Sequence, residues 1–519
     1  MQLVAYGAQD IYLTGNPQIT FFKVVYRRHT NFSMESIEQT FNGTADFGKK
    51  VTCTISRNGD LIHRVYLQAT VPQVRVEAGA FRWLNYLGHI LVKNVEVEIG
   101  GQRIDKHYGD WLHIWNELTQ TAGHQAGYAN MVGNVPRLTQ PVLGRSSQGS
   151  TDLSRSACDK DSCIPQTTLY IPLQFWFCRN PGLALPLIAL QYHEVKINLE
   201  FNSLTNCYWT TTTSTINPST PSLVSASLYV DYIYLDTDER RRFAQVSHEY
   251  LIEQLQFTGD ESVNSASNKI KLNFNHPCKE LIWVCQPDSN VDADTTANVG
   301  GKQHFNYTDK IDVSYYSGSP SDPLGGGMYS QSGNPFSAMP MTGRTATAAG
   351  VEGGATVSSV GTASTSNGIL NSAAVTFESL LAGGDSLAGN SSAYTAALPY
   401  YDLGHNPVEK AKLQLNGHDR FSEREGRYFN LVQPYQHHEN VPATGINVYS
   451  FGLKPEEHQP SGTCNMSRID NAVLQLTLSD EAVKSGNSNQ AKSCKVRVYA
   501  TNYNVLRIMS GMGGLAYSN

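Results

Sequence analysis

The sequence predicts an all-β protein made of two tandem β-sandwiches, with a few short helices and long loops. Three observations predict this fold class. Segments in which apolar and polar residues alternate recur along the 519 residues, helical spacing is scarce, and an order of elements in the first half returns in the second. Several strands per half, separated by long excursions, favour a two-sheet sandwich such as a jelly roll.

Strict alternation places one face of a strand on a core and the other face in water. The segments that alternate are 95–99, 195–201, 412–415, 474–478 and 495–499. Asn58-Gly59 and Asn416-Gly417 predict hairpin turns, because both central residues of a type I′ turn have positive φ.

Two short helices are predicted. Trp111, Ile114, Trp115 and Leu118 have the spacing i, i+3, i+4, i+7 and predict a helix after Asp110. The two tryptophans are interpreted as core anchors rather than as a ligand platform. The pattern Ser422-x-x-Glu425 predicts a capping box that opens the second helix.

These helices belong to an internal duplication. Residues 92–105 and 409–421 both read as strand, glycine turn and short strand, and each precedes one of the helices. Downstream, 195–201 corresponds to 473–478 and 228–234 to 496–500. A generic β chain would also contain similar strands, but the preserved order favours two similar domains that divide near 237–250.

The predicted division is therefore an N-terminal arm (1–25), a first jelly roll (26–240) and a second jelly roll (241–519). The second contains a long excursion rich in Gly, Ser, Ala and Thr at about 286–408, with no lysine between Lys310 and Lys410. Such a composition makes little core by itself, so the excursion is either a disordered linker or an elaborate surface loop on the second sandwich.

Only 16% of the residues are charged, against about a quarter in ordinary soluble proteins. This low charge fits a surface covered by neighbouring copies, and it also fits a β protein rich in uncharged polar residues. The net charge is −6, and the basic clusters at 27–28 and 240–242 are short. Direct nucleic-acid binding is therefore not expected. No signal peptide is predicted, and no apolar run approaches the roughly 20 residues of a membrane helix.

Nine cysteines, an odd number that lie mostly alone in strand-like runs, predict buried free thiols and a reducing compartment. Cys158 and Cys163 are the close pair, for which a disulfide or a metal role stays open, although no second pair completes a zinc set. In a strand the tandem His437-His438 would point to opposite faces, which disfavours a shared metal. No metal and no cofactor are predicted.

No nucleophile elbow, P-loop or H-E-x-x-H pattern occurs. The acidic pairs Asp236/Asp238 and Glu456/Glu457 are interpreted as solvated loop charges, so no catalytic residue is assigned and the chain is predicted not to be an enzyme. A secreted two-module carbohydrase would need a signal peptide and a convergent acid pair. A tandem lectin-like protein stays as the alternative function. Asn390, in a sequon of the polar excursion, is the candidate glycan site.

Five long segments carry a resemblance: 2–28, 99–108, 181–196, 460–471 and 503–517. They resemble the major capsid proteins of large icosahedral DNA viruses, the nucleocytoplasmic type that includes the phycodnaviruses and their chlorella viruses. The matches run in order along the whole chain. The excursion at 286–408 departs from the family in length and content, which puts its glycans and any receptor role in doubt.

The resemblance implies a double jelly roll and a homotrimer of pseudo-hexagonal outline. It also implies a late protein that is made and assembled in the host cytoplasm and located in the capsid shell of the virion. Its partners would be neighbouring capsomers, minor capsid proteins and penton proteins. The N-terminal arm would reach the inner viral membrane or membrane-associated proteins.

Several positions in the matching segments are given structural roles. Asn16-Pro17 is predicted to turn the arm, and Pro181-Gly182 and Pro460–Gly462 to form turns that enter strands. Glycines at the C-terminal end are predicted to form a permissive tail against a neighbour. The full set is Asn16, Pro17, Gly101, Pro181, Gly182, Pro460, Gly462, Cys464, Arg468, Gly511, Gly513 and Gly514.

Overall fold

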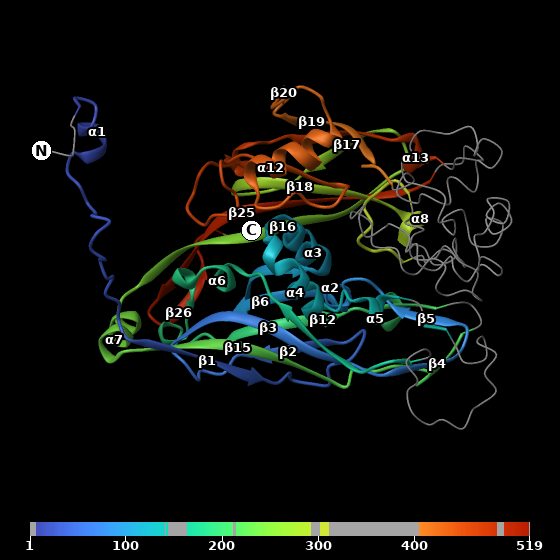
Figure 1. Cartoon of the computed structure of the whole chain (residues 1–519), viewed down its shortest axis with the longest axis horizontal. Helices are drawn as coiled ribbons and strands as arrows, with labels where there is room; N and C mark the ends of the chain where they lie inside the picture. Colours follow the sequence, from blue (N-terminus) through green and yellow to red (C-terminus); the bar gives the residue numbers. More distant parts are fainter. Residues whose placement is uncertain are drawn as a thin grey trace, which may run out of the picture.

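The computed structural model describes residues 7–140, 142–143, 163–210, 214–291, 302–310, 404–484 and 492–517. Four main sheets form two sandwiches, and Figure 1 shows one sandwich above the other with helix α3 between them. The predicted double jelly roll, with short helices and long loops, is confirmed.

The first jelly roll contains two sheets with four main strands each. Sheet 1a has the order β1-β15-β3-β10, and sheet 1b has the order β2-β12-β6-β7. The strands of sheet 1a are β1 (Phe32–Gln39), β15 (Ser225–Leu235), β3 (Leu61–Val71) and β10 (Thr167–Pro172). The strands of sheet 1b are β2 (Lys50–Thr54), β12 (Val195–Phe201), β6 (Val92–Ile99) and β7 (Gln102–Tyr108).

The second jelly roll repeats this plan. Sheet 2a has the order β16-β25-β18-β22, and sheet 2b has the order β17-β24-β19-β20. Sheet 2a consists of β16 (His248–Val263), β25 (Cys494–Met509), β18 (Pro277–Pro287) and β22 (Ile446–Ser450). Sheet 2b consists of β17 (Ser267–Leu272), β24 (Ala472–Leu478), β19 (Val408–Leu415) and β20 (His418–Asp419).

The eight main strands of the first jelly roll correspond, in chain order, to the eight main strands of the second. In chain order, β1, β2, β3, β6, β7, β10, β12 and β15 occupy the same sheet positions as β16, β17, β18, β19, β20, β22, β24 and β25. The duplication predicted from the order of patterns is therefore present in the topology. Helix α7 (Thr237–Gln245) connects the last strand of the first set to the first strand of the second.

Shorter strands extend the sheets or pair in the loops. They are β4 (Val74–Ala78), β5 (Ala80–Trp83), β8 (Val142–Leu143), β9 (Cys163–Ile164), β11 (Leu185–Pro186), β13 (Tyr208–Thr210), β14 (Thr215–Asn217), β21 (Arg424–Glu425), β23 (Cys464–Asn465) and β26 (Met512–Leu515).

The helices are short and lie mostly in connections. The α-helices are α1 (Ile11–Thr14), α2 (Leu87–Leu91), α3 (Gly109–Thr119), α4 (Ala122–Val132), α5 (Pro136–Thr139), α6 (Trp176–Arg179), α8 (Asp288–Val291), α12 (Gln433–His437) and α13 (Asp480–Val483), besides α7. Single turns of 3-10 helix are η2 (Pro181–Leu183), η3 (Leu187–Ala189), η4 (Leu204–Asn206) and η12 (Met466–Arg468). A π-helical turn, η11 (Tyr428–Val432), precedes α12, and together they form a continuous helical segment, helix 426–437. Among the described residues, no helix has the length and apolarity needed to cross a bilayer.

The alternating segments became strands for the expected reason. In β12, Val195, Ile197, Leu199 and Phe201 face the core of the first sandwich, and the residues between them are partly exposed. β24 shows the same pattern in the second sandwich. Each buried aliphatic side chain stabilises the fold by roughly 1.5–3 kcal/mol relative to an exposed one.

One of the two predicted hairpins is wrong. Asn416 and Gly417 have φ of 51° and 82°, and Leu415 pairs with His418, so this turn is a hairpin. Asn58-Gly59 instead connects β2 in sheet 1b to β3 in sheet 1a, and the two strands do not pair. The chain crosses from one sheet to the other at this point because both strands find longer partners elsewhere.

The predicted capping box is also wrong. Glu425 lies in β21, where it pairs with Lys410 of β19, and the helical segment starts only at Gly426. A backbone ladder with β19 thus replaced the helix start that Ser422 and Glu425 suggested. The helix itself is present, one turn later than predicted.

Candidate assembly surfaces

The two jelly rolls of the chain are joined by helix α3. Its apolar spacing is that of an amphipathic helix, and Trp111, Ile114, Trp115 and Leu118 are buried on the outer face of sheet 2a. The side chains that receive them are Ile282 and Val284 of β18, Ile446 and Val448 of β22, and Tyr499 of β25. The predicted role of the tryptophans as core anchors is confirmed, and the core that they anchor lies between the two domains.

Polar contacts fix the position of α3. The guanidinium of Arg497 on β25 lies 2.8 Å from Asp110, in the first turn of α3, and 2.9 Å from Asp260 of β16. Burial raises the pKa of Asp110, and the positive charge of Arg497 opposes that rise. Beside the helix, the strand β7 lies along β16, where the Leu255 amide donates to the Asp105 carboxylate at 3.1 Å.

A first buried carboxylate, Glu253 of β16, links the domains through charge. Its oxygens lie 2.9 Å from Arg179 of α6 and 2.9 Å from Lys279 of β18. Burial alone would raise the pKa of Glu253. The His458 imidazole, 3.5 Å away, and the charges of Arg179 and Lys279 outweigh burial, so the pKa of Glu253 is about 2.

A second buried cluster surrounds His438, just after helix 426–437. Its side chain is fully buried, with Nε2 2.9 Å from Glu280 and Nδ1 2.7 Å from Glu456. Burial opposes the charged imidazolium, but the two carboxylates outweigh it and raise the pKa of His438 to about 9. The contact to Glu280 is an ion pair without a hydrogen bond of good geometry.

Sequence reasoning did not find this cluster. His437-His438 ends a helix and does not lie in a strand, so the expected arrangement on opposite strand faces is wrong. Glu456 was interpreted as a solvated loop charge, yet it pairs with His438. The available signal was Lys279-Glu280, a pair of charges directly before the wholly buried run 281–285.

Helix 426–437 itself has a free apolar side. Leu431, Val432 and Tyr435 are exposed, Tyr435 to 80%, and Arg427 is exposed at the start of the segment. The opposite side packs inward through Phe429, which belongs to the core of the second sandwich. Exposed apolar residues that cluster on one element are typical of contact surfaces.

The outer face of sheet 1a carries a cluster of tyrosines, Tyr66 of β3, Tyr229 of β15 and Tyr170 of β10. The rings of Tyr66 and Tyr229 stack with centroids 5.3 Å apart, and those of Tyr66 and Tyr170 are 6.3 Å apart. Tyr170 is 40% exposed. Tyr66 and Tyr229 are partly exposed, whereas Ile282 and Tyr499, on the face of sheet 2a that α3 covers, are fully buried.

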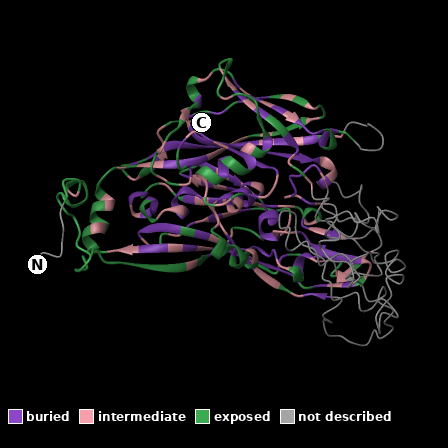
Figure 2. Ribbon diagram, turned by 45° about the horizontal axis from the view of Figure 1, so that its top comes forward, coloured by how far each residue is buried: buried purple, intermediate pink, exposed green. Residues whose placement is uncertain are grey.

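The N-terminal arm, together with the residues that connect it to β1, is a third exposed surface. Residues 7–31 extend away from the sandwiches, and Figure 2 shows them mostly in the colour of exposed residues. The large apolar side chains of this segment are all exposed: Ile11, Tyr12, Leu13, Ile19, Phe21, Phe22, Val24, Val25 and Tyr26.

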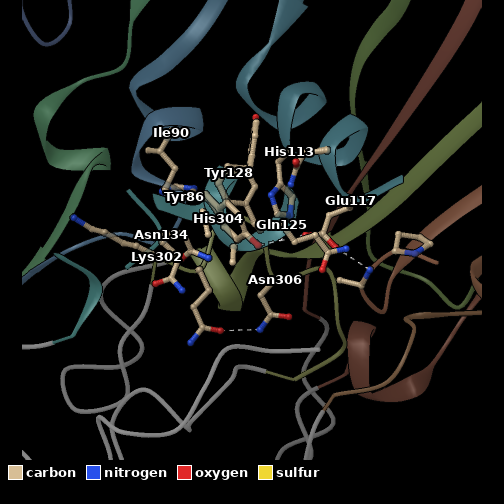
Figure 3. A pocket seen from close by; sticks show the side chains of 18 of the residues that line it. Tyr86, Ile90, His113, Glu117, Gln125, Tyr128, Asn134, Lys302, His304 and Asn306 are labelled. Atoms are coloured by element: carbon tan, nitrogen blue, oxygen red, sulfur yellow. Dashed lines mark hydrogen bonds between the residues drawn. The ribbon is translucent and has the colours of Figure 1, made fainter. Parts of the chain in front are cut away.

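A cavity of about 530 Å³ lies at the seam between the jelly rolls (Figure 3). Helices α3 and α4 line one side, and residues 302–306 and 441–443 line the other. His113 stacks on Phe305 with ring centroids 4.2 Å apart, and its Nδ1 has no hydrogen-bond partner. Burial lowers the pKa of His113 and lowers that of His304 to about 4. At neutral pH these two imidazoles are therefore uncharged, and Arg82, Glu117 and Lys302 also line the cavity.

The described residues include no group of three His, Cys, Asp or Glu side chains arranged to hold a metal ion. Seven cysteines carry free thiols, and six of these are buried: Cys53, Cys178, Cys207, Cys278, Cys285 and Cys494. Cys163 is disulfide-bonded, and Cys158, the other member of the close pair, lies outside the described residues.

The predicted turn positions fall in connections. Asn16 has φ of 51° within the exposed arm, and Gly101, with φ of 85°, follows Gly100 in the turn from β6 to β7. Pro181 and Gly182 form η2, where the Gly182 amide donates to the Asn180 side chain at 2.8 Å. Gly462, two residues after Pro460, has φ of 140° before β23.

The remaining predicted positions lie in the second jelly roll, close to β18 and β25 of sheet 2a. Cys464 on β23 pairs with Cys278 of β18 through the backbone, and Arg468 ends η12 on the surface. The glycine tail lies against the first jelly roll of its own chain: the Tyr192 amide donates to the Gly511 carbonyl at 3.0 Å. A Cβ on Gly513 would lie 2.7 Å from Leu190, and one on Gly514 would lie 3.3 Å from Gln102. A contact of this tail with a neighbouring copy stays a prediction, and Asn390 lies outside the described residues.

Two tandem jelly rolls in one chain are the architecture of a class of viral capsid proteins, and comparison with known families agrees. Residues 239–514 match the family described as large eukaryotic DNA virus major capsid protein. Residues 20–236 match the family described as major capsid protein N-terminus. The chain belongs to the major capsid protein family of large eukaryotic DNA viruses.

Relatives align over the whole chain. The major capsid protein of Phaeocystis pouchetii virus is 57% identical, and that of Paramecium bursaria Chlorella virus 1 is 41% identical; both alignments cover 100% of this chain and 99% of the relative. A chain of the PBCV-1 virus capsid matches with a TM-score of 0.62 and 36% identity, covering 96% of this chain and 100% of that one. The Faustovirus major capsid protein, at 13% identity and a TM-score of 0.65, shares the fold over 97% of this chain and 94% of its own.

The chain is thus a structural protein of a virion and not an enzyme, as the sequence predicted. None of these relatives supports the tandem lectin alternative.

Proposed function

We propose that three copies of this chain form a trimeric capsomer of pseudo-hexagonal outline, and that neighbouring capsomers tile an icosahedral shell. The observation that carries the proposal is the identical strand order of the two jelly rolls. Three chains with two similar bodies each present six similar sides, and six similar sides pack a plane hexagonally. Cyclic closure of identical chains is the usual way to satisfy such contacts.

The proposed domains of the chain are an arm at 1–25, a first jelly roll at 26–240 and a second jelly roll at 241–519, which contains the excursion at about 286–408. The main strands of the first jelly roll lie between Phe32 and Leu235, and those of the second between His248 and Met509, which supports this division. The two family matches meet between residues 236 and 239, which also supports it.

The finer partners in the proposal are minor capsid and penton proteins, with the arm directed at the inner viral membrane or its associated proteins. The exposed apolar side chains of the arm support such a contact, because they would otherwise remain in water. The net charge of −6 supports a shell that does not bind the genome directly. Synthesis and assembly in the host cytoplasm complete the proposal.

Light scattering after size-exclusion chromatography of the full chain tests the trimer. A mass of three chains is the expected result. A stable monomer at all accessible concentrations would contradict trimer formation by this chain alone. Dimers, or open aggregates of increasing mass, would contradict closure of three chains into a ring.

A further inference from the structure

The packing within one chain shows how one jelly roll is joined to the next. Helix α3, which follows β7, covers the outer face of sheet 2a, and the edge strand β7 lies along the edge strand β16. The first jelly roll therefore donates a helix and an edge, and the second receives both. This contact is heterologous, because the donating and receiving surfaces differ.

The second jelly roll has the same donating elements without a partner. Helix 426–437 follows β20 and β21 as α3 follows β7, and both helical segments start at a glycine, Gly426 and Gly109. On α3 the apolar side is buried by sheet 2a. On helix 426–437 the side formed by Leu431, Val432 and Tyr435 is exposed.

The first jelly roll has the same receiving elements, and the described residues leave their tyrosines exposed or partly exposed. Strands β3, β15 and β10 of sheet 1a correspond to β18, β25 and β22 of sheet 2a, which receive α3. Paired residues lie on one face of a sheet, and the pair Tyr66–Tyr229 on β3 and β15 corresponds in place to Ile282–Tyr499 on β18 and β25. The tyrosine cluster therefore occupies the position that Ile282 and Tyr499 occupy under α3.

We propose that helix 426–437 of one copy packs on the outer face of sheet 1a of the next copy, so that the contact between α3 and sheet 2a is repeated between chains. This inference rests on the proposed trimer and names the surfaces that form it. Two kinds of step, one within each chain and one between chains, then alternate around a closed ring of six jelly rolls.

The charges of the two surfaces agree with this pairing. Arg427 is exposed on the helix, and Arg424 lies just before it, over the ring of Tyr428. The sheet face carries Glu38 of β1, opposite Tyr229, and Asp231 of β15, together with Arg64 of β3. In the contact within the chain, helix α3 carries the negative charge, on Asp110, and sheet 2a carries the positive charge, on Arg497. Between chains the signs are reversed, which disfavours α3 as a competitor for sheet 1a.

A pair of complementary variants tests the inference. The helix variant is L431D/Y435D, and the sheet variant is Y66D/Y170D. Each places carboxylates in one of the two surfaces, and each is expected to weaken trimer formation by about 100-fold or more, because central aromatic contacts dominate interfaces. The control is V246D, which adds one carboxylate at an exposed apolar residue on neither surface and should leave the trimer intact.

Mixing the two variants gives the sharper result. Each variant keeps one intact surface, and the intact helix of the sheet variant fits the intact sheet of the helix variant. The mixture should therefore form a heterodimer with the mass of two chains, and no trimer. Circular dichroism and the unfolding midpoint of each isolated variant show whether it is folded, and the single change Y170D replaces the double variant if it is not.

The outcomes separate this inference from the proposed trimer. A wild-type chain that stays monomeric removes the trimer and this contact together. Wild-type trimers that survive both variants leave the trimer standing and overturn the contact. Loss of the trimer with only one variant, or self-association of a variant that the mixture does not change, also overturns it, because the two surfaces would then not be partners.

Discussion

Helix α3 and helix 426–437 occupy equivalent places in the two jelly rolls, yet their surroundings differ. The first is covered on its apolar side by sheet 2a, and the second exposes Leu431 and Tyr435. The difference does not come from the local fold, because the strands before and after both helices correspond. It comes from the number of repeats: a chain of two units has one internal contact and leaves one helix and one sheet face at its ends.

The largest effect is expected at α3, the buried helix of the two. Trp111→Ala removes a fully buried side chain from the contact between the jelly rolls and should lower the free energy of unfolding by about 3–5 kcal/mol. Tyr435→Ala is the matched change on the equivalent helix and should cost less than about 0.5 kcal/mol in the unassembled chain. Urea unfolding at one low protein concentration measures both. Equal losses would show that the two helices have equal partners within the chain.

The two adjacent histidines behind helix 426–437 should also differ. His438→Gln leaves Glu280 buried without its ion pair and should cost about 3 kcal/mol of unfolding free energy. His437→Gln, one residue earlier, removes only a contact to the Leu453 carbonyl on the surface and should cost little. Parallel urea curves for the two variants test this, and a similar midpoint for both would contradict a special role of the buried pair.

Alkaline pH should abolish this difference between the two histidine variants. The pKa of His438 is about 9 when folded, against 6.5 for an unpaired histidine, so folding favours its protonated form. Its contribution is therefore complete below pH 6.5 and disappears as the pH rises through 9, a loss of about 3 kcal/mol in all.

Unfolding free energies from pH 6 to 10 measure this loss, and His438→Gln should flatten the curve across that range. A wild-type curve with no decline toward pH 10 would show that the buried imidazolium adds no stability.

The smallest effects concern two glycines with open space around the missing Cβ. Gly417→Ala should destabilise by about 1 kcal/mol, because Gly417 has φ of 82° in its hairpin turn. Gly127→Ala should stabilise by about 0.5–1 kcal/mol, because Gly127 lies inside helix α4. Thermal midpoints that move in opposite directions confirm the pair, and a shift in the same direction would contradict one of the two backbone assignments.

Long periodic patterns in the sequence predicted their strands and helices correctly. The alternation at 195–201 and the spacing of Trp111 to Leu118 each specify one buried face, and both elements formed as predicted. Patterns of two or four residues were less reliable. Asn58-Gly59 and Ser422–Glu425 each suit two structures, and pairing with distant strands decided between them.

The sequence by itself determined the strands, the two-fold repeat and the family, because periodicity and ordered motifs are properties of the chain. The tertiary structure alone decided which charges are buried and which helix has a partner. His438, Glu280 and Glu456 are 18 to 176 residues apart in sequence. Only the packing of β18 against the loops that follow helix 426–437 and β22 brings them together. The reason is that burial depends on what covers a side chain. An apolar helix face that is exposed in the single chain has the same kind of composition as one that a sheet of the same chain covers.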